Sequence, residues 1–264
     1  MSGRAVPSSV PAQPTTAAAD VGSDADEPVA LSEQFLLAVR RGEPTADLAA
    51  ALADLGDRAL AAALDTDRAR VAFWVNVYNA VTQRALSADP GRYDSRRAFF
   101  GADLVAVAGH PLSLDDMEHG ILRRSYHRYG LGHLRVPGPL RDDFADRHAP
   151  SECDPRIHFA LNCGAESCPP VAAYTRDRVD EQLDWATEGY LETQVEYDPE
   201  AGTVLVPRVM LWFRGDFGGK RGIYNFLRRY DQLPGGVEPS LSYREWDWAF
   251  DPADYADGER AGES

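Results

Sequence analysis

Basic residues are scarce in this sequence of 264 residues, and lysine is almost absent. The chain has 27 Lys and Arg against 42 Asp and Glu, a net charge of -15, and Lys220 is the only lysine. A chain with this charge repels the phosphates of a nucleic acid, so we expect no nucleic-acid partner. The same composition is typical of proteins that work in a salt-rich cytoplasm and of proteins encoded by a GC-rich genome. A halophilic origin is therefore a hypothesis.

Long apolar runs are missing as well. No stretch is long enough to cross a bilayer, and the N-terminus lacks the basic start and continuous apolar run of a secretory signal. We therefore expect a cytoplasmic protein outside the membrane. Cysteine is rare too, because Cys153, Cys163 and Cys168 are too few and too clustered to form the disulfide framework of a small secreted protein.

The two ends of the chain contain few large apolar side chains. Residues 1–28 are rich in Ser, Pro, Thr, Ala and Asp, and cannot bury enough surface to offset the entropy cost of ordering. We predict a disordered acidic tail there and a second acidic tail over 251–264. Hydrophobic residues make up 44% of the chain, enough for a full core, so residues 29–250 are interpreted as a single domain.

Helical periodicity dominates the first half of that domain. Apolar residues at spacings of three and four predict three short helices between residues 31 and 64. A stronger helix is predicted over 67–86, where apolar side chains occupy most of the circumference, as in a central buried helix. Asn76 and Asn79 lie on a narrow polar stripe of that helix, and they need hydrogen-bond partners inside the protein or line a site.

Short strands mix with helices in the second half. The patterns predict a hairpin over 104–112, a helix from Ser113 to about Arg124 with Asp116 in its cap, a strand over 156–162, a helix capped by Thr175, a hairpin of 195–197 with 203–206, and a helix over 223–230. This order favours an α+β fold over a regular βαβ array. We expect a helical N-terminal half packed on a small mixed or antiparallel sheet.

The segment RIHFALNCGAESCPP, residues 156–170, is the candidate functional centre. Cys163 follows the predicted strand in a glycine-containing loop, where backbone N–H groups can hold an anion, as a nucleophilic thiol requires. A thiolate also needs a nearby cation or base to lower its pKa. His119, which has Glu118 beside it and comes from another predicted element, suits that role.

The other histidine of this region, His158, is less suitable. It lies five residues before Cys163, so an extended strand would separate the two by about 16 Å. No histidine follows His158, which excludes the papain-like order of cysteine before histidine and favours His119 as the base. Asn76 or Asn79 can orient the imidazole. The leading hypothesis is a thiol-dependent hydrolase or transferase that binds a small-molecule or protein partner and uses no cofactor.

Other interpretations of the same residues stay open. Cys163 can be a buried apolar residue of a non-catalytic binding or scaffold domain, in which the polar residues only hold the structure together. Cys163 and Cys168 can form a redox pair, although CGAESC is not the CxxC motif. Cys153 and His158 can join both of them at a zinc ion, although the spacing matches no common zinc motif. The loop GDFGGKRG, residues 215–222, is no Walker motif and is interpreted as a mobile loop or the rim of a site.

Five ordered blocks of the sequence resemble a known family. They are FWVNVYNA at 73–80, SLDDMEHGILR at 113–123, DPRIHFALNCGAESCPP at 154–170, LWFRGDFGG at 211–219 and YREWDWAF at 243–250. In this order they are similar to the signature blocks of the domain of unknown function 547, over roughly residues 30–250. The resemblance implies one fold unit and no established activity, so function has to be argued from the residues themselves.

Overall fold

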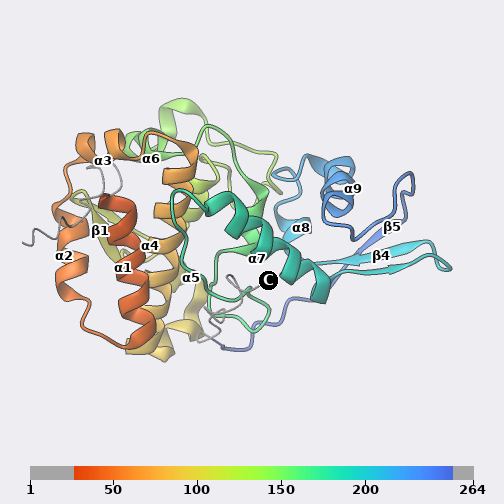
Figure 1. Ribbon diagram of the computed structural model, residues 1–264, viewed down its shortest axis with the longest axis horizontal. Coiled ribbons are helices and arrows are strands. Elements are labelled where there is room, and N and C mark those ends of the chain that lie inside the picture. The colour runs from red at the N-terminus through yellow and green to blue at the C-terminus, as the bar shows by residue number, and fades with distance from the viewer. Residues whose placement is uncertain (1–26, 252–264) are drawn as a thin grey trace, which may run out of the picture.

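The computed structural model describes residues 27–251, and helices fill its first half (Figure 1). These helices are α1 (Glu27–Arg41), α2 (Ala46–Asp54), α3 (Asp57–Ala63), α4 (Asp67–Ala88), the 3-10 helix η1 (Pro90–Ser95) and α5 (Arg96–Phe100). The three short helices and the helix predicted over 67–86 are confirmed by α1 to α4. The predicted tails lie outside the described residues, except that Glu27 and Pro28 belong to α1 and that Asp251 is described.

The central helix of the molecule is α4. Its apolar residues surround the helix axis, and Phe73, Trp74 and Val77 are fully buried. The helix begins where the side chain of Thr66 accepts a hydrogen bond from the N–H of Ala69. Because α1 packs along α4 and most of the α4 surface is covered, its polar side chains face protein and need protein partners.

The predicted hairpin after α5 is confirmed. Strand β1 (Val105–Val107) pairs with β2 (His110–Leu112) in antiparallel register. The turn between them has positive φ at both Ala108 (51°) and Gly109 (76°), as a two-residue hairpin turn of this type requires. The N–H groups of both turn residues donate to carbonyls at the end of α2, so the hairpin also satisfies acceptors that the helix leaves free.

The helix predicted after Ser113 begins as expected but is wound more widely. The N–H and Oγ of Ser113 donate to Oδ2 of Asp116 at 3.0 and 2.6 Å, and the N–H of Asp116 donates to Oγ of Ser113 at 3.1 Å. Residues Asp116–Leu122 then form a π-helix, η2, in which the N–H of Arg123 donates to the carbonyl of Glu118. Such wide turns are rare and are frequently found at functional sites.

The strand predicted over 156–162 is wrong. Pro155–Phe159 forms a 3-10 helix, η4, whose start is fixed by the proline ring and by Asp154, which accepts a hydrogen bond from the N–H of Arg156 at 2.9 Å. The alternating apolar residues are buried, as a strand would also bury them, but no described strand pairs with them. The extended spacing expected between the histidine and the first cysteine of this segment therefore does not apply.

The second half also contains η3 (Gly138–Leu140), α6 (Asp143–His148), α7 (Val179–Gln194), β3 (Glu196–Asp198), β4 (Thr203–Val206), α8 (Val209–Trp212), α9 (Gly219–Arg229) and β5 (Ser240–Tyr243). The hairpin of β3 with β4 and the helix predicted over 223–230 are confirmed, and β5 adds an unpredicted parallel strand beside β4. The cap predicted at Thr175 is wrong. Arg178 occupies the cap position of α7, and the N–H of Thr175 donates instead to the side chain of Gln182.

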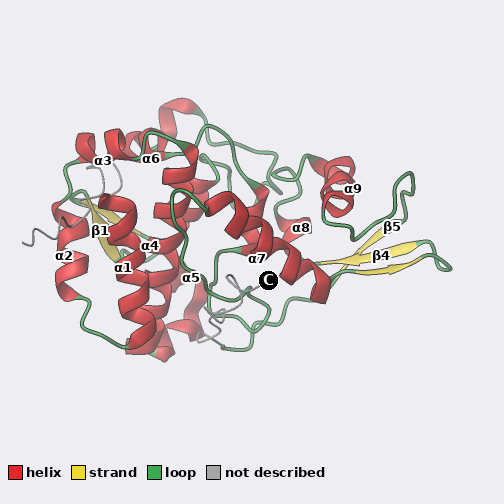
Figure 2. Ribbon diagram, viewed as in Figure 1, coloured by secondary structure: helices red, strands yellow, loops and turns green. Residues whose placement is uncertain are grey.

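These elements confirm the α+β class, with one sheet of two strands and one mixed sheet of three strands. The helical half and the first hairpin share one hydrophobic core, while α9 and the three-stranded sheet surround a second core. Figure 2 shows the three-stranded sheet at the end of the molecule opposite α2 and α3. Residues of both cores therefore lie where the two halves meet.

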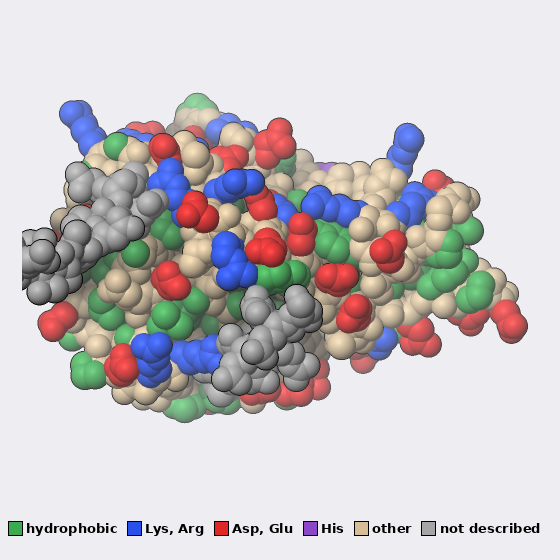
Figure 3. Space-filling model, in the orientation of Figure 1, with side chains coloured by type: hydrophobic (Ala, Val, Ile, Leu, Met, Phe, Trp, Pro, Cys, Tyr) green, Lys and Arg blue, Asp and Glu red, His purple; other side chains and the backbone are tan. Residues whose placement is uncertain are grey.

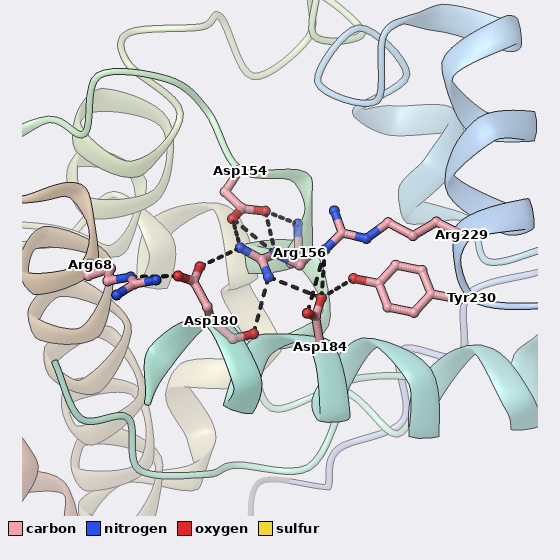
Figure 4. A network of polar contacts seen from close by, with 7 residues as sticks. All are labelled: Arg68, Asp154, Arg156, Asp180, Asp184, Arg229 and Tyr230. Carbon is pink, nitrogen blue, oxygen red and sulfur yellow. Dashed lines mark hydrogen bonds and ion pairs between the residues drawn. The ribbon is translucent and has the colours of Figure 1, made fainter. Parts of the chain in front are cut away.

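Arg156 of η4 links the two halves (Figure 4). Its guanidinium donates to the carboxylates of Asp154, Asp180 and Asp184 at distances of 2.6 to 3.0 Å. Asp184 also accepts a hydrogen bond from Arg229 at 3.2 Å. Because Asp180 and Asp184 belong to α7 and Arg229 ends α9, this network holds η4 against both helices.

The surface and the helices agree with the absence of long apolar runs. On the face drawn in Figure 3, Lys and Arg side chains lie among Asp and Glu side chains. Among residues 27–251, no helix combines the length and the apolar character that crossing a membrane requires.

Candidate functional site

A cavity of about 370 Å³ lies where the two halves meet. Its lining includes four of the predicted site residues, Glu118, His119, His158 and Cys163, together with Cys168. The remaining walls come from α4, α5, α8, the segment after η2 and the C-terminal segment. The predicted residues Asn76 and Asn79 do not line this cavity.

Cys163 and Cys168 face each other at the wall of the cavity. Both thiols are free and their Sγ atoms are 3.0 Å apart. The backbone N–H of Cys163 also donates to Sγ of Cys168 at 3.1 Å. The loop between them folds back because Gly164 adopts a φ of 89° and the N–H of Cys168 donates to the carbonyl of Ala165 at 2.9 Å.

The two thiols have opposite pKa shifts. Burial raises the pKa of Cys168, but hydrogen bonds from the Cys163 thiol and from the N–H groups of Cys163, Ala165 and Gly164 outweigh it, so this pKa is lowered. The pKa of Cys163 is well above its usual range because its thiol donates to Cys168 and is also buried. A thiolate of this pair is better stabilised at Cys168, whose Sγ accepts the N–H of Cys163 and, once ionised, the S–H of Cys163 as well.

Asn79 and Asn162 hold this loop against α4. Nδ2 of Asn79 donates to the carbonyl of Ala160 at 2.9 Å, and the N–H of Asn162 donates to Oδ1 of Asn79 at 3.0 Å. Asn162 in turn accepts from the N–H of Gly164 at 2.8 Å and donates to the carbonyl of Pro169 at 2.9 Å. The N–H of Gly164, predicted to face an anion, thus has a side-chain partner.

Asn76 fixes a different segment of the chain. Its amide exchanges two hydrogen bonds with the backbone of Tyr174, at 2.8 and 2.9 Å, and its Nδ2 also donates to Oγ of Ser32 at 3.2 Å. All three residues are buried. The structure therefore gives Asn76 and Asn79 backbone partners, whereas an arginine contacts the imidazole that they were predicted to orient.

Arg123, Asp216 and two histidines form a buried chain of hydrogen bonds. Arg123 donates to both carboxylate oxygens of Asp216, at 2.6 and 3.1 Å, and to Nδ1 of His119 at 3.0 Å. Nε2 of His158 lies 2.9 Å from Oδ2 of Asp216, and its ring stacks on Phe213 with centroids 4.1 Å apart. The side chains of Arg123 and Asp216 are fully buried.

This chain fixes the protonation of His119. An arginine only donates, so Nδ1 of His119 accepts and the proton of the neutral ring is on Nε2. Burial and the charges of Arg123 and Arg128 hold the pKa of His119 well below its usual value. For Asp216, burial raises the pKa, but hydrogen bonds from His158 and Arg123 outweigh it and keep this pKa well below its usual range.

Acidic groups and a tyrosine complete the polar wall. Burial raises the pKa of Glu118 to about 7. Asp115 is paired with Arg128 on the same wall. The pKa of Tyr78 is raised well above its usual value, first by burial and then by the negative charge of Glu118 and of the two cysteines. Tyr78, which α4 carries, therefore belongs to the polar part of the cavity.

The C-terminal segment covers the cysteine loop. Residues 164–167 exchange backbone and side-chain hydrogen bonds with residues 247–251. This pairing brings Trp246 and Trp248 to the cavity, where their ring centroids lie 5.3 and 5.8 Å from that of Trp212. Three tryptophans from two distant segments thus form one wall.

The four residues of the zinc alternative are not gathered at one point. Cys153 lines a second cavity of about 440 Å³, beside Asp154 and Arg156, and His158 is engaged with Asp216. Over the described range 27–251, no group of three His, Cys, Asp or Glu side chains is placed to hold a metal ion. The geometry therefore gives this alternative no support.

Asp216 is a residue of the candidate site that the sequence does not single out. It lies in the loop interpreted as a rim or a mobile loop, yet its carboxylate is buried and binds Arg123 and His158. The glycine before it explains part of that loop, because a Cβ on Gly215 would lie 2.1 Å from the carbonyl oxygen of Gly132. A buried arginine in a predicted helix is the signal that a carboxylate partner has to exist, but nothing in the sequence says which one.

Comparison with known proteins finds one matching family. No curated protein and no solved structure matches the chain. The family described as "Protein of unknown function, DUF547" matches residues 62–191, a range that holds α4, η2, η4 and the cysteine loop. The blocks at 211–219 and 243–250 lie outside the matched range. Through residues 62–191, this chain belongs to the DUF547 family of proteins of unknown function.

Proposed function

We propose that Cys163 and Cys168 form a dithiol pair that exchanges with a disulfide or a thiol bound in the adjoining cavity. The observation that carries the proposal is the distance of 3.0 Å between the Sγ atoms of two free thiols that both line the cavity. Thiol–disulfide exchange needs one thiolate that attacks and a second thiol within reach that resolves the mixed disulfide. The opposite pKa shifts of the two cysteines match these two roles.

The exchange proceeds in two steps. The thiolate of Cys168 attacks one sulfur of the substrate disulfide, the substrate S–S bond breaks, and its other half leaves as a thiolate. Cys163 then gives its proton to that leaving thiolate and attacks the sulfur of Cys168. This step forms the disulfide between the two cysteines and releases the second half of the substrate as a thiolate, so the substrate gains two electrons and the cysteines lose two.

Two neighbouring groups suit the proton movement. Glu118 lines the cavity with both cysteines, and a carboxyl group with a pKa of about 7 accepts and releases a proton near neutral pH. It is therefore suited to relay the proton of Cys163 to the leaving thiolate. His119 carries its proton on Nε2 and is suited to donate a hydrogen bond to a sulfur that gains charge.

Mass spectrometry of the native protein in glutathione redox buffers tests the pair. We expect a reversible disulfide between Cys163 and Cys168, with Cys153 remaining a thiol. Cys163→Ser should hold the substrate as a stable mixed disulfide on Cys168, because the resolving thiol is gone. Cys153→Ser is the matched control and should behave like the wild-type protein.

The result that contradicts the proposal is equally clear. If Cys163 and Cys168 stay reduced in buffers that fully oxidise a small exposed dithiol, the pair does no exchange chemistry. The polar residues around them would then only hold the cysteine loop against α4, as the non-catalytic interpretation states.

A second candidate is the hydrolase or transferase predicted from the sequence, with Cys163 as nucleophile and His119 as base. It is favoured by the fact that both residues line one cavity. In this role His119 has to accept a proton, but its unprotonated nitrogen, Nδ1, already accepts a hydrogen bond from Arg123. An activated thioester separates the two candidates, because a hydrolase still forms an acyl group on Cys163 in Cys168→Ser, whereas the dithiol pair loses its reaction with disulfides in that variant.

A further inference from the structure

The thiol pair lies inside a cavity and not on an open surface. Cys168 is 6% exposed, and residues 247–251 cover the loop that carries it. A disulfide within a folded protein is held by two chain segments. These segments would have to enter the cavity for the disulfide to reach the attacking sulfur directly. A cavity of about 370 Å³ falls within the range of pockets that enclose small molecules.

The walls around the pair are mainly apolar and aromatic. Trp212 and Trp248 lie with ring centroids 5.8 Å apart and an angle of 28° between their planes, and Trp246 packs beside both. Phe213 and Tyr129 line other parts of the same cavity. Flat aromatic faces of this kind favour a planar ring, which packs on them in stacked or edge-to-face geometry.

The charges in the cavity disfavour an anion. Arg128 is the only Lys or Arg among the described lining residues, and it is paired with Asp115. Glu118 and the thiolate of Cys168 add negative charge, while the lowered pKa of His119 keeps its ring neutral. A further negative charge brought in by a ligand would be repelled at close range in this poorly solvated space.

We propose that the cavity takes a small uncharged aromatic disulfide, or the aromatic thiol that it yields, in preference to a protein disulfide or an anionic peptide disulfide. The inference rests on the proposed dithiol function and adds its substrate class. One ring of the substrate packs on the tryptophan wall and its disulfide meets Sγ of Cys168. The substrate is reduced to two aromatic thiols while the two cysteines become a disulfide, by the steps given above.

Three probes test this selectivity at neutral pH: dithiodipyridine, which is aromatic and uncharged; dithiobisnitrobenzoate, which is aromatic and anionic; and hydroxyethyl disulfide, which is uncharged and aliphatic. Each rate with the native protein is divided by the rate with the same protein unfolded in urea, which removes differences in intrinsic reactivity. We expect the ratio for dithiodipyridine to exceed that for hydroxyethyl disulfide by roughly tenfold, as the packing of one aromatic ring allows. It should also exceed the ratio for dithiobisnitrobenzoate, which the negative charge of the cavity repels.

Variants of the tryptophan wall locate the effect. Trp248→Ala should lower the ratio for dithiodipyridine severalfold and lower it more than the ratio for hydroxyethyl disulfide. Trp185→Ala, which alters a 40% exposed tryptophan of α7, is the matched control and should change neither. If circular dichroism shows that Trp248→Ala does not fold, the milder Trp212→Phe makes the same comparison.

The outcomes separate the two proposals. Equal ratios for the three probes, with a disulfide forming between Cys163 and Cys168, overturn the aromatic preference and leave the dithiol function standing. A failure of every probe to produce that disulfide overturns the dithiol function itself.

Discussion

The guanidinium of Arg123 is bound to the carboxylate of Asp216 by two hydrogen bonds, at 2.6 and 3.1 Å, and both side chains are fully buried. The two residues come from segments 93 positions apart, one ending the π-helix η2 and the other in the loop before α9. The pair therefore ties the polar wall of the cavity, which carries Glu118, to the second half of the chain. It also fixes His119, to which Arg123 donates its third hydrogen bond.

Asp216→Asn should destabilise the fold at neutral pH. The substitution leaves the buried charge of Arg123 without its counterion, and breaking such a pair costs about 3–5 kcal/mol. Because the pKa of Asp216 is lowered in the folded state, its contribution is present above the unfolded pKa of about 3.9 and is lost as the pH falls below it. Urea unfolding between pH 3 and pH 7 measures both the loss and its decline in acid.

The matched control for this experiment is Asp94→Asn, at an exposed aspartate. It should leave the free energy of unfolding within about 0.5 kcal/mol of the wild-type value. A loss in Asp216→Asn no larger than that of the control would contradict the role of the pair.

Glu118→Gln should stabilise the protein at alkaline pH. The folded carboxyl group has a pKa of about 7, raised by burial from an ordinary value of 4.5. Between these values the folded state binds more protons than the unfolded state, so the wild-type protein loses stability as the pH rises through this window. The variant avoids that loss, and its free energy of unfolding should exceed the wild-type value at pH 8 by about 2 kcal/mol.

At pH 4 the advantage of Glu118→Gln should disappear, because the carboxyl group of Glu118 is then mainly protonated in both the folded and the unfolded protein. Glu192→Gln, at an exposed position of α7, serves as control and should show no comparable dependence on pH. A constant difference between Glu118→Gln and the wild-type protein from pH 4 to pH 8 would argue against a raised pKa at Glu118.

Gly215→Ala should displace the loop that carries Asp216. A Cβ at this position would lie 2.1 Å from the carbonyl oxygen of Gly132, which is backbone and cannot move aside cheaply. Gly189→Ala is the control, since nothing lies within 4 Å of a Cβ there and alanine favours the helix α7 by about 1 kcal/mol. Thermal unfolding should show a lower Tm for the first variant and an equal or higher Tm for the second.

Several parts of the fold are predictable from the sequence because they depend on local patterns. The helix α4 follows from apolar periodicity, the capping box from Ser113 and Asp116, and the hairpin of β3 with β4 from its alternation and turn. The strand predicted over 156–162 fails because alternation of apolar residues cannot distinguish a paired strand from a buried 3-10 turn. In this segment Pro155 and Asp154 decide the local conformation.

The candidate site is only partly predictable, for a related reason. Glu118, His119 and Cys163 are named by residue type and spacing, and the structure brings all three to one cavity. Asp216 and the wall of Trp246 and Trp248 depend on contacts between distant segments, which periodicity does not encode. Which of two adjacent thiols ionises first depends on hydrogen bonds from the folded loop, and these exist only once the loop is closed.

The role of Cys168 as the attacking thiol is tested most directly by the alkylation rate of each cysteine against pH in the native protein, with the labelled residue identified by mass spectrometry. We predict that Cys168 is alkylated first, with a midpoint below the value of about 8.5 for a free cysteine, and that Cys163→Ala raises this midpoint because the thiol donor is lost. Preferential alkylation of Cys163, or a midpoint for Cys168 at or above that of free cysteine, would contradict this role of Cys168.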